Sequence, residues 1–149
     1  MTTTSQPERA WLGVVSADHA RRATAGGFIQ LNHGKRPGVA RLRLGDGFVI
    51  YSPTDQYGEK TPLRAFTALG VVADAEPYQA EPMSMGAHGI VSPWRRRIDF
   101  DPVEPAALTD LNAELILTQQ PNWGYQLRRG LVILAVEDFL LLRSAMAQR

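Results

Sequence analysis

The chain has 149 residues, of which 44% are hydrophobic and 21% charged, and its formal net charge is +1. This length and composition are typical of one globular domain with a single hydrophobic core. The chain contains no cysteine, which excludes a disulfide framework and a cysteine-ligated metal.

Short apolar runs separated by turn residues predict a series of short elements. In the first half, in chain order, we predict a strand at Trp11–Ser16, a helix at Ala17–Thr24 ending at Gly26–Gly27, a strand at Phe28–Leu31, a loop at Asn32–Gly38, a strand at Phe48–Tyr51 and a strand at Phe66–Val72 with a bulge at Gly70. In the second half we predict extended chain and then loop at Glu76–Ser92, an edge or half-exposed strand at Trp94–Phe100, a helix at Pro105–Leu117, a turn at Pro121–Gly124, a buried strand at Gly130–Val136 and a helix at Glu137–Ala147.

About six strands and about three helices, without strand–helix–strand alternation, predict an α+β domain built on a small curved sheet or barrel. Residues 1–10 are predicted to form a flexible tail, and residues 11–149 a single domain. The tail lacks the basic and apolar regions of a signal peptide, and the longest apolar run, Leu131–Val136, is far too short to cross a membrane. We therefore expect a soluble, cytoplasmic protein.

The basic residues are unevenly distributed. Of the 16, only Lys35 and Lys60 are lysines, and the rest are arginines. Several arginines are clustered, at Arg21–Arg22, Arg41 with Arg43, Arg95–Arg97 and Arg128–Arg129. The planar guanidinium suits phosphates and base edges better than an ammonium does. A GC-rich genome would explain the number of arginines but not their clustering.

The motifs of common enzymes do not occur. The chain has no phosphate-binding loop and no dinucleotide-binding GxGxxG, and Gly13–Ala17 reads GVVSA rather than GxSxG. Ser16, Asp18 and His19 are close in sequence, but a catalytic triad is defined by geometry. No two of the three histidines have the spacing of zinc ligands. We predict no catalytic residue, metal or cofactor.

The remaining unusual residues are aromatic. Trp11, Tyr51, Trp94 and Trp123 each occur at an element end or in a turn, beside the polar or basic residues Ser16, Ser52, Arg95 and Asn122. Stacking one base on an aromatic ring contributes about 1–3 kcal/mol. These residues therefore suit a base-binding site, although tryptophans that simply pack a small core remain the alternative.

Eight stretches of the chain, in order, resemble the EVE-domain family and its small stand-alone bacterial members. They are WLGVVSADHA, GGFIQLNHGK, RLRLGDGFVIYSP, PLRAFTALGVV, EPYQAEPM, PWRRRIDF, NWGYQLRRGL and EDFLLLRSAM, and they span residues 11 to about 147. The resemblance implies a PUA-like fold, a small pseudo-barrel with flanking helices. It also implies a non-catalytic module that takes a modified DNA or RNA base into a pocket. The loops at Arg36–Val39 and Ser84–Ser92 depart from the family pattern, which leaves the preferred base open.

The resemblance also implies roles for individual residues. Ser16 and Ser52 would hydrogen-bond the base edge or its sugar, and Tyr51, Trp94 and Trp123 are the candidates for stacking. Gln30, His33 and Lys35 would contact polar base atoms or a phosphate. Arg95, Arg96 and Arg128 would contact the nucleic-acid backbone, although Arg95–Arg97 could equally form a solvated strand face.

Two other functions stay open at this point. One is a protein-interaction module with a vestigial pocket. The other is an enzyme acting on a nucleotide or a modified base through His33, Lys35 and Asp99. The sequence does not distinguish DNA from RNA. A reader without an effector domain of its own would also work with an effector protein as a further partner, and no membrane partner is expected.

Overall fold

The computed structural model describes residues 6–56, 58 and 60–148. The first half of the chain forms β1 (Ala10–Val14), α1 (Ala17–Gly26), β2 (Phe28–Ile29), the 3₁₀ turn η1 (Asn32–Gly34), α2 (Arg36–Ala40), β3 (Gly47–Ser52) and β4 (Ala65–Val72). The second half forms β5 (Tyr78–Gln79), β6 (Met83–Ser84), η2 (Gly86–His88), β7 (Ile90–Val91), β8 (Trp94–Phe100), β9 (Ala106–Ala107), α3 (Leu108–Leu111), α4 (Ile116–Gln119), α5 (Trp123–Gln126), η3 (Leu127–Arg129), β10 (Leu131–Leu134) and α6 (Val136–Met146).

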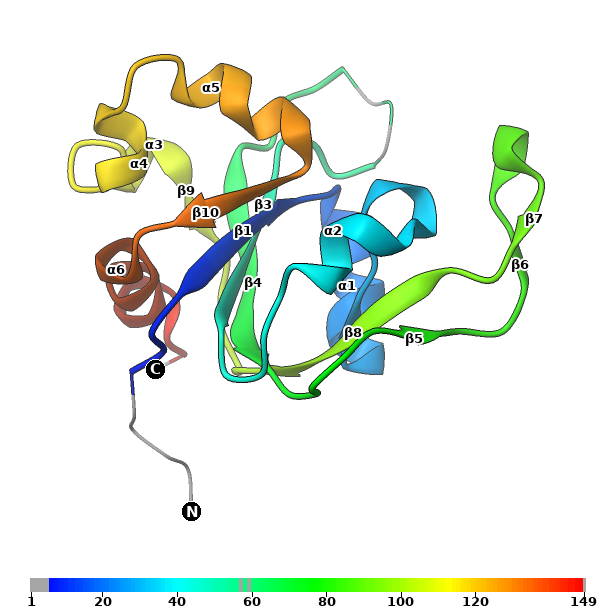
Figure 1. Ribbon diagram of the computed structural model, residues 1–149. Helices are drawn as coiled ribbons and strands as arrows, with labels where there is room; N and C mark the ends of the chain where they lie inside the picture. Colours follow the sequence, from blue (N-terminus) through cyan, green and yellow to red (C-terminus); the bar gives the residue numbers. More distant parts are fainter. Residues whose placement is uncertain (1–5, 57, 59, 149) are drawn as a thin grey trace.

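The strands form one mixed, strongly curved sheet and a small separate ribbon (Figure 1). The order in the main sheet is β10-β1-β3-β4-β8-β2, with β5 added to β8 and β9 added to β4. Strands β1 and β3 are parallel, and the other pairs are antiparallel. Strands β6 and β7 form an arm that projects from the body. The α+β prediction is confirmed, but the main sheet has eight strands rather than about six.

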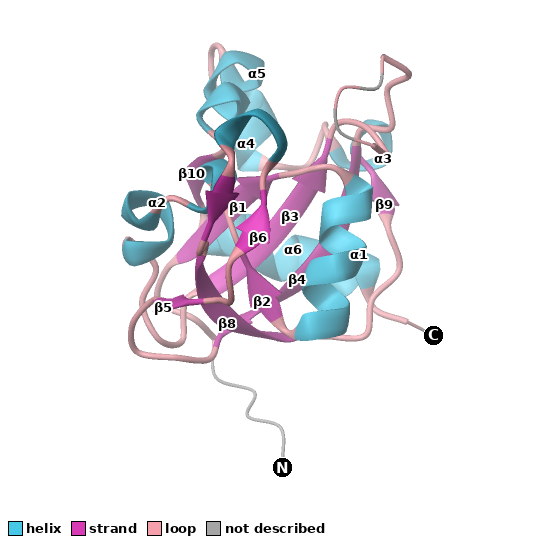
Figure 2. Cartoon of the chain, turned by 90° about the vertical axis from the view of Figure 1, so that its right-hand side faces the viewer, coloured by secondary structure: helices cyan, strands magenta, loops and turns pink. Residues whose placement is uncertain are grey.

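The core lies on both faces of this sheet. Because side chains alternate along a strand, Val49 of β3 packs on one side, with Phe139 of α6. Phe48 and Ile50 pack on the other side, with Ala20 of α1. Figure 2 shows α1 in front of the sheet and α6 behind it. All six residues of β3 are therefore buried.

Most long elements lie where they are predicted, and the differences have local causes. Strand β1 already begins at Ala10, and residues 1–5 of the predicted tail lie outside the described residues. The predicted loop at 32–38 contains η1 and the start of α2, which has Pro37 in its first turn. The predicted helix at 105–117 is broken into β9, α3 and the start of α4. Strand β8 is half-exposed, which is one of the two predicted alternatives, but it is not an edge strand, because it pairs with β4, β2 and β5.

The predicted bulge is also displaced. Ile50 pairs with Ala68 and Tyr51 with Phe66, so the extra residue of β4 is Thr67 rather than Gly70. Gly70 serves close packing instead, because a Cβ there would lie 2.3 Å from the carbonyl oxygen of Asp99.

Asp138 joins α6 to the start of α4. Its carboxylate is 1% exposed and accepts hydrogen bonds from the backbone N–H groups of Ile116 and Leu117, both at 2.8 Å. The two N–H groups at a helix start would otherwise lack partners.

We expect Asp138→Ala to lower the free energy of unfolding by about 2 kcal/mol, as measured by urea denaturation. Glu137→Ala, at the exposed neighbouring position, is the control, and an equal loss in both variants would contradict this role.

Candidate functional site

The first turn of α1 is fixed to the end of β3. Ser16 is the N-cap of α1, and its Oγ accepts a hydrogen bond from the backbone N–H of His19 at 3.2 Å. The backbone N–H groups of Ala17 and Asp18 donate to the carbonyls of Thr54 and Asp55, at 3.0 and 2.8 Å. The predicted site residue Ser16 therefore positions the turn that carries His19.

A polar cluster forms where α1, β2 and β8 meet. We call His19, Phe28, Gln30 and Arg95 the α1–β2–β8 cluster. Phe28 pairs with Arg97 in the β2–β8 ladder and Ile29 with Arg96, which brings Gln30 beside Arg95. The Nε of Arg95 donates to Oε1 of Gln30 at 3.0 Å, and its guanidinium lies 3.8 Å from the centroid of the Phe28 ring. Gln30 is only 8% exposed, so this contact is sheltered from bulk water.

His19 has an unusual electrostatic environment within this cluster. Its pKa is lowered from 6.5 to about 4, chiefly by desolvation on burial and in addition by the nearby charges of Arg22 and Arg95, while Asp18 opposes this shift. The imidazole is therefore neutral at pH 7 and presents one donor and one acceptor. Among the described residues, neither its ring nitrogens nor Nε2 of Gln30 has a hydrogen-bond partner in the protein.

A left-handed turn follows the cluster. Asn32, His33 and Gly34 have φ values of 49°, 59° and 81°. Such values cost about 1–2 kcal/mol per residue outside glycine, so the surroundings must hold the turn in place. A Cβ on Gly34 would lie 2.6 Å from Cβ of Pro93, so the turn packs closely on the chain that leads into β8. The turn leaves the predicted contacts His33 and Lys35 exposed.

The three aromatic candidates do not come together. Trp94 is half-buried, packs on the α1 side of the core and has the guanidinium of Arg36 5.3 Å from its ring centroid. Trp123 is half-buried on the α6 side of the core. Tyr51 is 5% exposed and packs 5.4 Å from Phe66, between ring centroids, and burial raises its pKa. The predicted stacking role of Tyr51 is therefore wrong.

Two further predictions are corrected by burial. Ser52 is 0% exposed, and its hydroxyl is hydrogen-bonded to that of Thr67 at 2.8 Å. Arg96 is also 0% exposed. Its guanidinium donates to Asp74 Oδ1 at 2.6 Å and to the carbonyls of Asp74, Val39 and Leu42. Neither side chain can reach a nucleic acid in this fold, so both are structural residues.

Arg128, the last predicted backbone contact, lies in η3. It is exposed, and its guanidinium lies 5.3 Å from the ring centroid of Tyr125, which is itself 66% exposed. Of the predicted residues, the structure therefore brings Gln30 and Arg95 into contact. Four others lie near this pair in the chain or at the start of α1: His33 and Lys35 follow Gln30, Trp94 precedes Arg95, and Ser16 caps α1. Trp123 and Arg128 belong to the α5–η3 segment.

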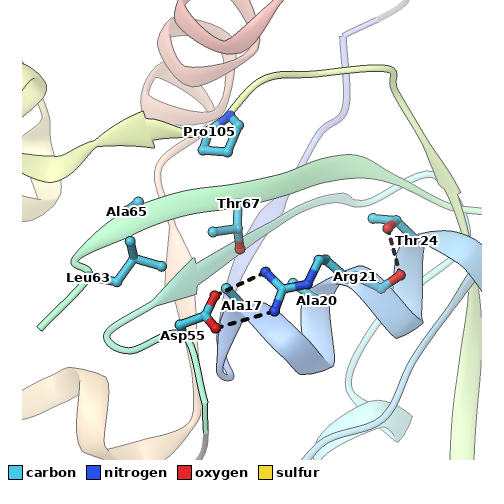
Figure 3. Close-up of a pocket in the computed structure, with 9 residues that line it drawn as sticks. All are labelled: Ala17, Ala20, Arg21, Thr24, Asp55, Leu63, Ala65, Thr67 and Pro105. Carbon is cyan, nitrogen blue, oxygen red and sulfur yellow. Dashed lines mark hydrogen bonds and ion pairs between the residues drawn. The ribbon is translucent and has the colours of Figure 1, made fainter. Parts of the chain in front are cut away.

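A separate cavity of about 280 Å³ lies between α1 and β4 (Figure 3). It is lined by Ala17, Ala20, Arg21, Thr24, Asp55, Leu63, Ala65, Thr67 and Pro105, none of which is a predicted site residue. Its two charged residues are paired with each other, with Nη1 of Arg21 3.0 Å from Oδ1 of Asp55. The cavity is mostly apolar and offers a ligand no unpaired charge.

The sequence interpretation missed His19 and Phe28 as site residues. Both lie within the stretches that resemble the EVE family, and His19 follows the helix-capping Ser16 by three residues. The spacing of three residues from the N-cap could have identified His19 as a residue of the first helical turn. Within the described part of the chain, no group of three or more His, Cys, Asp or Glu side chains could hold a metal, and no helix is long and apolar enough to cross a membrane.

Comparisons with known proteins agree with this fold. A UPF0310 protein of Renibacterium salmoninarum is 45% identical over 135 residues, which cover 91% of this chain and 93% of that protein. The UPF0310 protein YdcG of Bacillus subtilis is 37% identical over 139 residues, which cover 91% and 90%. The crystal structure of an Agrobacterium tumefaciens protein covers 92% of both chains with a TM-score of 0.53 at 15% identity, which shows a shared fold. The sequence pattern of the EVE domain matches residues 9–145. Because this match spans almost the whole chain, the chain belongs to the EVE-domain family.

Proposed function

We propose that this chain is a nucleic-acid-binding module with a PUA-like fold, and that it recognises a modified base in DNA or RNA. Membership of the EVE-domain family supports the nucleic-acid part of this proposal. The α1–β2–β8 cluster supports the base-recognition part. Its residues come from three separate elements, and the fold holds them together.

The observation that carries the proposal is the set of open hydrogen-bonding groups in this cluster. Gln30 Nε2 and the neutral His19 ring have no partner among the described residues, and these atoms are accessible to solvent, because no buried side-chain nitrogen or oxygen in that part of the chain lacks a partner. Accessible polar groups without a protein partner are hydrated in the free protein, so they are available to hydrogen-bond a ligand. An amide and a neutral imidazole each offer both donor and acceptor atoms, as the edge of a base does.

The cations without an acidic partner suit a polyanion. Among the described residues, Lys35, Arg36, Arg41, Arg128 and Arg129 have no carboxylate within 4.0 Å, whereas the ion-paired cations are Arg9, Arg21, Arg22, Arg96 and Arg143. The net charge of only +1 does not reveal these unpaired cations. Phosphate contacts of this kind supply affinity without sequence preference.

The same geometry favours binding over catalysis. A general base works best when its pKa lies near the operating pH, and the pKa of His19 is about 4. At pH 7 its imidazole is a hydrogen-bonding group and a weak base. We therefore propose a non-catalytic reader, which would act together with an effector protein.

The experiment is a fluorescence-polarisation titration with short oligonucleotides. We use single-stranded DNA, duplex DNA and RNA, each plain or carrying methylcytosine, hydroxymethylcytosine or methyladenine. The proposed function predicts at least tenfold tighter binding to one modified form. Equal binding to every modified and plain oligonucleotide would contradict base recognition.

Substitution of Arg95 tests whether the cluster makes this discrimination. We expect Arg95→Gln to reduce the ratio of modified to plain affinity by about tenfold or more, because one well-placed guanidinium contact contributes about 1–3 kcal/mol of discrimination. Arg97→Gln, at an exposed position on the same strand, is the control with the same change of charge. A ratio that survives in Arg95→Gln, with the fold intact by circular dichroism, would place the base elsewhere.

A further inference from the structure

A second cavity, of about 270 Å³, opens beside the edge strand β10. It is bounded by η1, α2, the end of α5, η3 and β10. Its lining residues are Asn32, Gly38, Arg41, Gln126, Arg129, Leu131, Val132 and Ile133. We call it the β10-edge cavity. None of the residues predicted from the sequence to contact a base or a backbone lines it.

The polar groups of this cavity match an anion. Arg41 and Arg129 supply two guanidinium groups, and no carboxylate among the described residues lies within 4.0 Å of either. Asn32 and Gln126 add two amides, and no acidic residue lines the cavity. The cavity between α1 and β4 differs in this respect, because there Asp55 already pairs with Arg21. Guanidinium groups and amide N–H groups are the donors that bind phosphate oxygens.

Contacts of Arg41 and Asn32 hold two of these four groups in place before any ligand binds. The guanidinium of Arg41 lies 4.8 Å from the ring centroid of the buried Trp11. The amide of Asn32 lies against two glycines, because a Cβ on Gly38 would be 3.2 Å from its Nδ2 and a Cβ on Gly130 2.9 Å from its Oδ1. A binding site whose donors are already ordered loses less entropy when the ligand arrives.

The cavity is also close to the α1–β2–β8 cluster. Asn32 lines the cavity, and Gln30 of the cluster precedes it by two residues. Two residues of extended chain span at most about 7 Å between Cα atoms. A nucleic acid whose base reaches Gln30 therefore has its neighbouring sugar–phosphate near the cavity.

We propose that the β10-edge cavity binds one phosphodiester of the nucleic acid, next to the nucleotide whose base enters the α1–β2–β8 cluster. This inference rests on the proposed function and deepens it. Arg41 and Arg129 bind the phosphate oxygens, and Asn32 and Gln126 donate amide hydrogen bonds. The α1–β2–β8 cluster recognises the base, while the β10-edge cavity fixes the position of the nucleic-acid strand.

The test is the salt dependence of binding to a single-stranded oligonucleotide that carries the preferred base. Each phosphate neutralised on a single strand contributes about 0.7 to the slope of log K against log salt. We expect Arg129→Gln and Arg41→Gln each to weaken binding and to reduce the slope by up to that amount, with the modified-to-plain ratio unchanged. Arg43→Gln, which removes the same charge from an exposed residue outside the cavity, should keep the wild-type slope.

A second arm locates the phosphate. One neutral methylphosphonate is placed in turn at each linkage of the oligonucleotide. We expect one position beside the preferred base to weaken wild-type binding but to have no further effect in Arg129→Gln. A wild-type slope in both cavity variants, or additive effects at every linkage, would overturn the subsite while the base preference stands. Inorganic phosphate competing as well as the oligonucleotide would show a free-anion site instead. Failure of every oligonucleotide to bind would remove the proposed function and this subsite together.

Discussion

Replacing the buried Arg96 with methionine is expected to lower the free energy of unfolding by about 3–5 kcal/mol, the range measured when one partner of a buried ion pair is removed. The methionine fills much of the volume but donates no hydrogen bond. Asp74 then loses its ion pair, and the carbonyls of Val39 and Leu42 each lose the hydrogen bond that Arg96 donates. Typical domains are stable by only about 5–15 kcal/mol, so this single change removes a large fraction of the total. Urea denaturation followed by circular dichroism measures it.

Two further variants identify the mechanism. Arg96→Lys keeps the charge, but one ammonium cannot reproduce the planar fork that reaches Asp74, Val39 and Leu42. We expect it to recover only part of the loss. Arg97→Met is the matched control, because Arg97 is exposed on the same strand. Its guanidinium lies 4.7 Å from the ring centroid of Tyr78, a contact worth about 1 kcal/mol or less. Equal losses in Arg96→Met and Arg97→Met would show that Arg96 does not hold the fold together.

The arginine run also shows what the sequence can and cannot predict. Alternation along a strand places Arg95 and Arg97 on one side of β8 and Arg96 on the other. The sequence does not indicate that either side is buried, because all three residues are arginines and a charged side chain is normally exposed. Arg96 is buried because Asp74 and two carbonyls surround it, and those partners lie 22 to 57 residues away in the chain.

Strand β3 shows the same limit in apolar form. Its existence follows from the run GFVIYS, and the prediction is confirmed. A strand covered on both faces, however, shows no alternation of apolar and polar residues. The pattern therefore predicts a polar strand end at Tyr51 and Ser52, whereas Tyr51 belongs to the core that includes α6, and Ser52 is buried with its hydroxyl bonded to Thr67. Elements were easier to predict than exposure because exposure depends on the layers that cover the sheet.

Only part of the α1–β2–β8 cluster is predictable from the sequence, for a related reason. The family resemblance identifies Gln30 and Arg95 as separate contacts, and the β2–β8 ladder brings the two side chains together. His19 and Phe28 became candidates only when the fold placed Arg95 against them. The depressed pKa of His19 depends on burial and on an arginine 76 positions later, and no local pattern encodes it.

That pKa makes the stability of the free protein depend on pH in a defined window. An unfolded chain protonates His19 near pH 6.5, whereas the folded chain does so only near pH 4. Between these values the unfolded state binds more protons, so the free energy of unfolding falls as the pH falls. The pKa difference corresponds to about 3 kcal/mol over the whole window. Stability should change little from this group above pH 6.5 and below pH 4.

Urea denaturation at a series of pH values, with circular dichroism as the readout, measures this dependence. His19→Gln should abolish most of the decline between pH 6.5 and 4, because the amide does not titrate. His33→Gln removes an exposed histidine and is the matched control, in which the decline should persist. The lowered pKa values of Asp46 and Asp55 add their own losses only below the ordinary aspartate value of 3.8, so they do not overlap with this window.

The same measurement connects stability to the site. Protonation of His19 would place a third positive charge beside Arg22 and Arg95, with only Asp18 to oppose it. Retaining a neutral imidazole keeps an acceptor available for a ligand, at the cost of stability in mild acid. If the decline persists unchanged in His19→Gln, the imidazole is not the buried neutral group described, and its hydrogen-bonding role in the cluster falls with it. If the decline disappears only in His19→Gln, the cluster holds an open, neutral donor and acceptor at physiological pH, as base recognition requires.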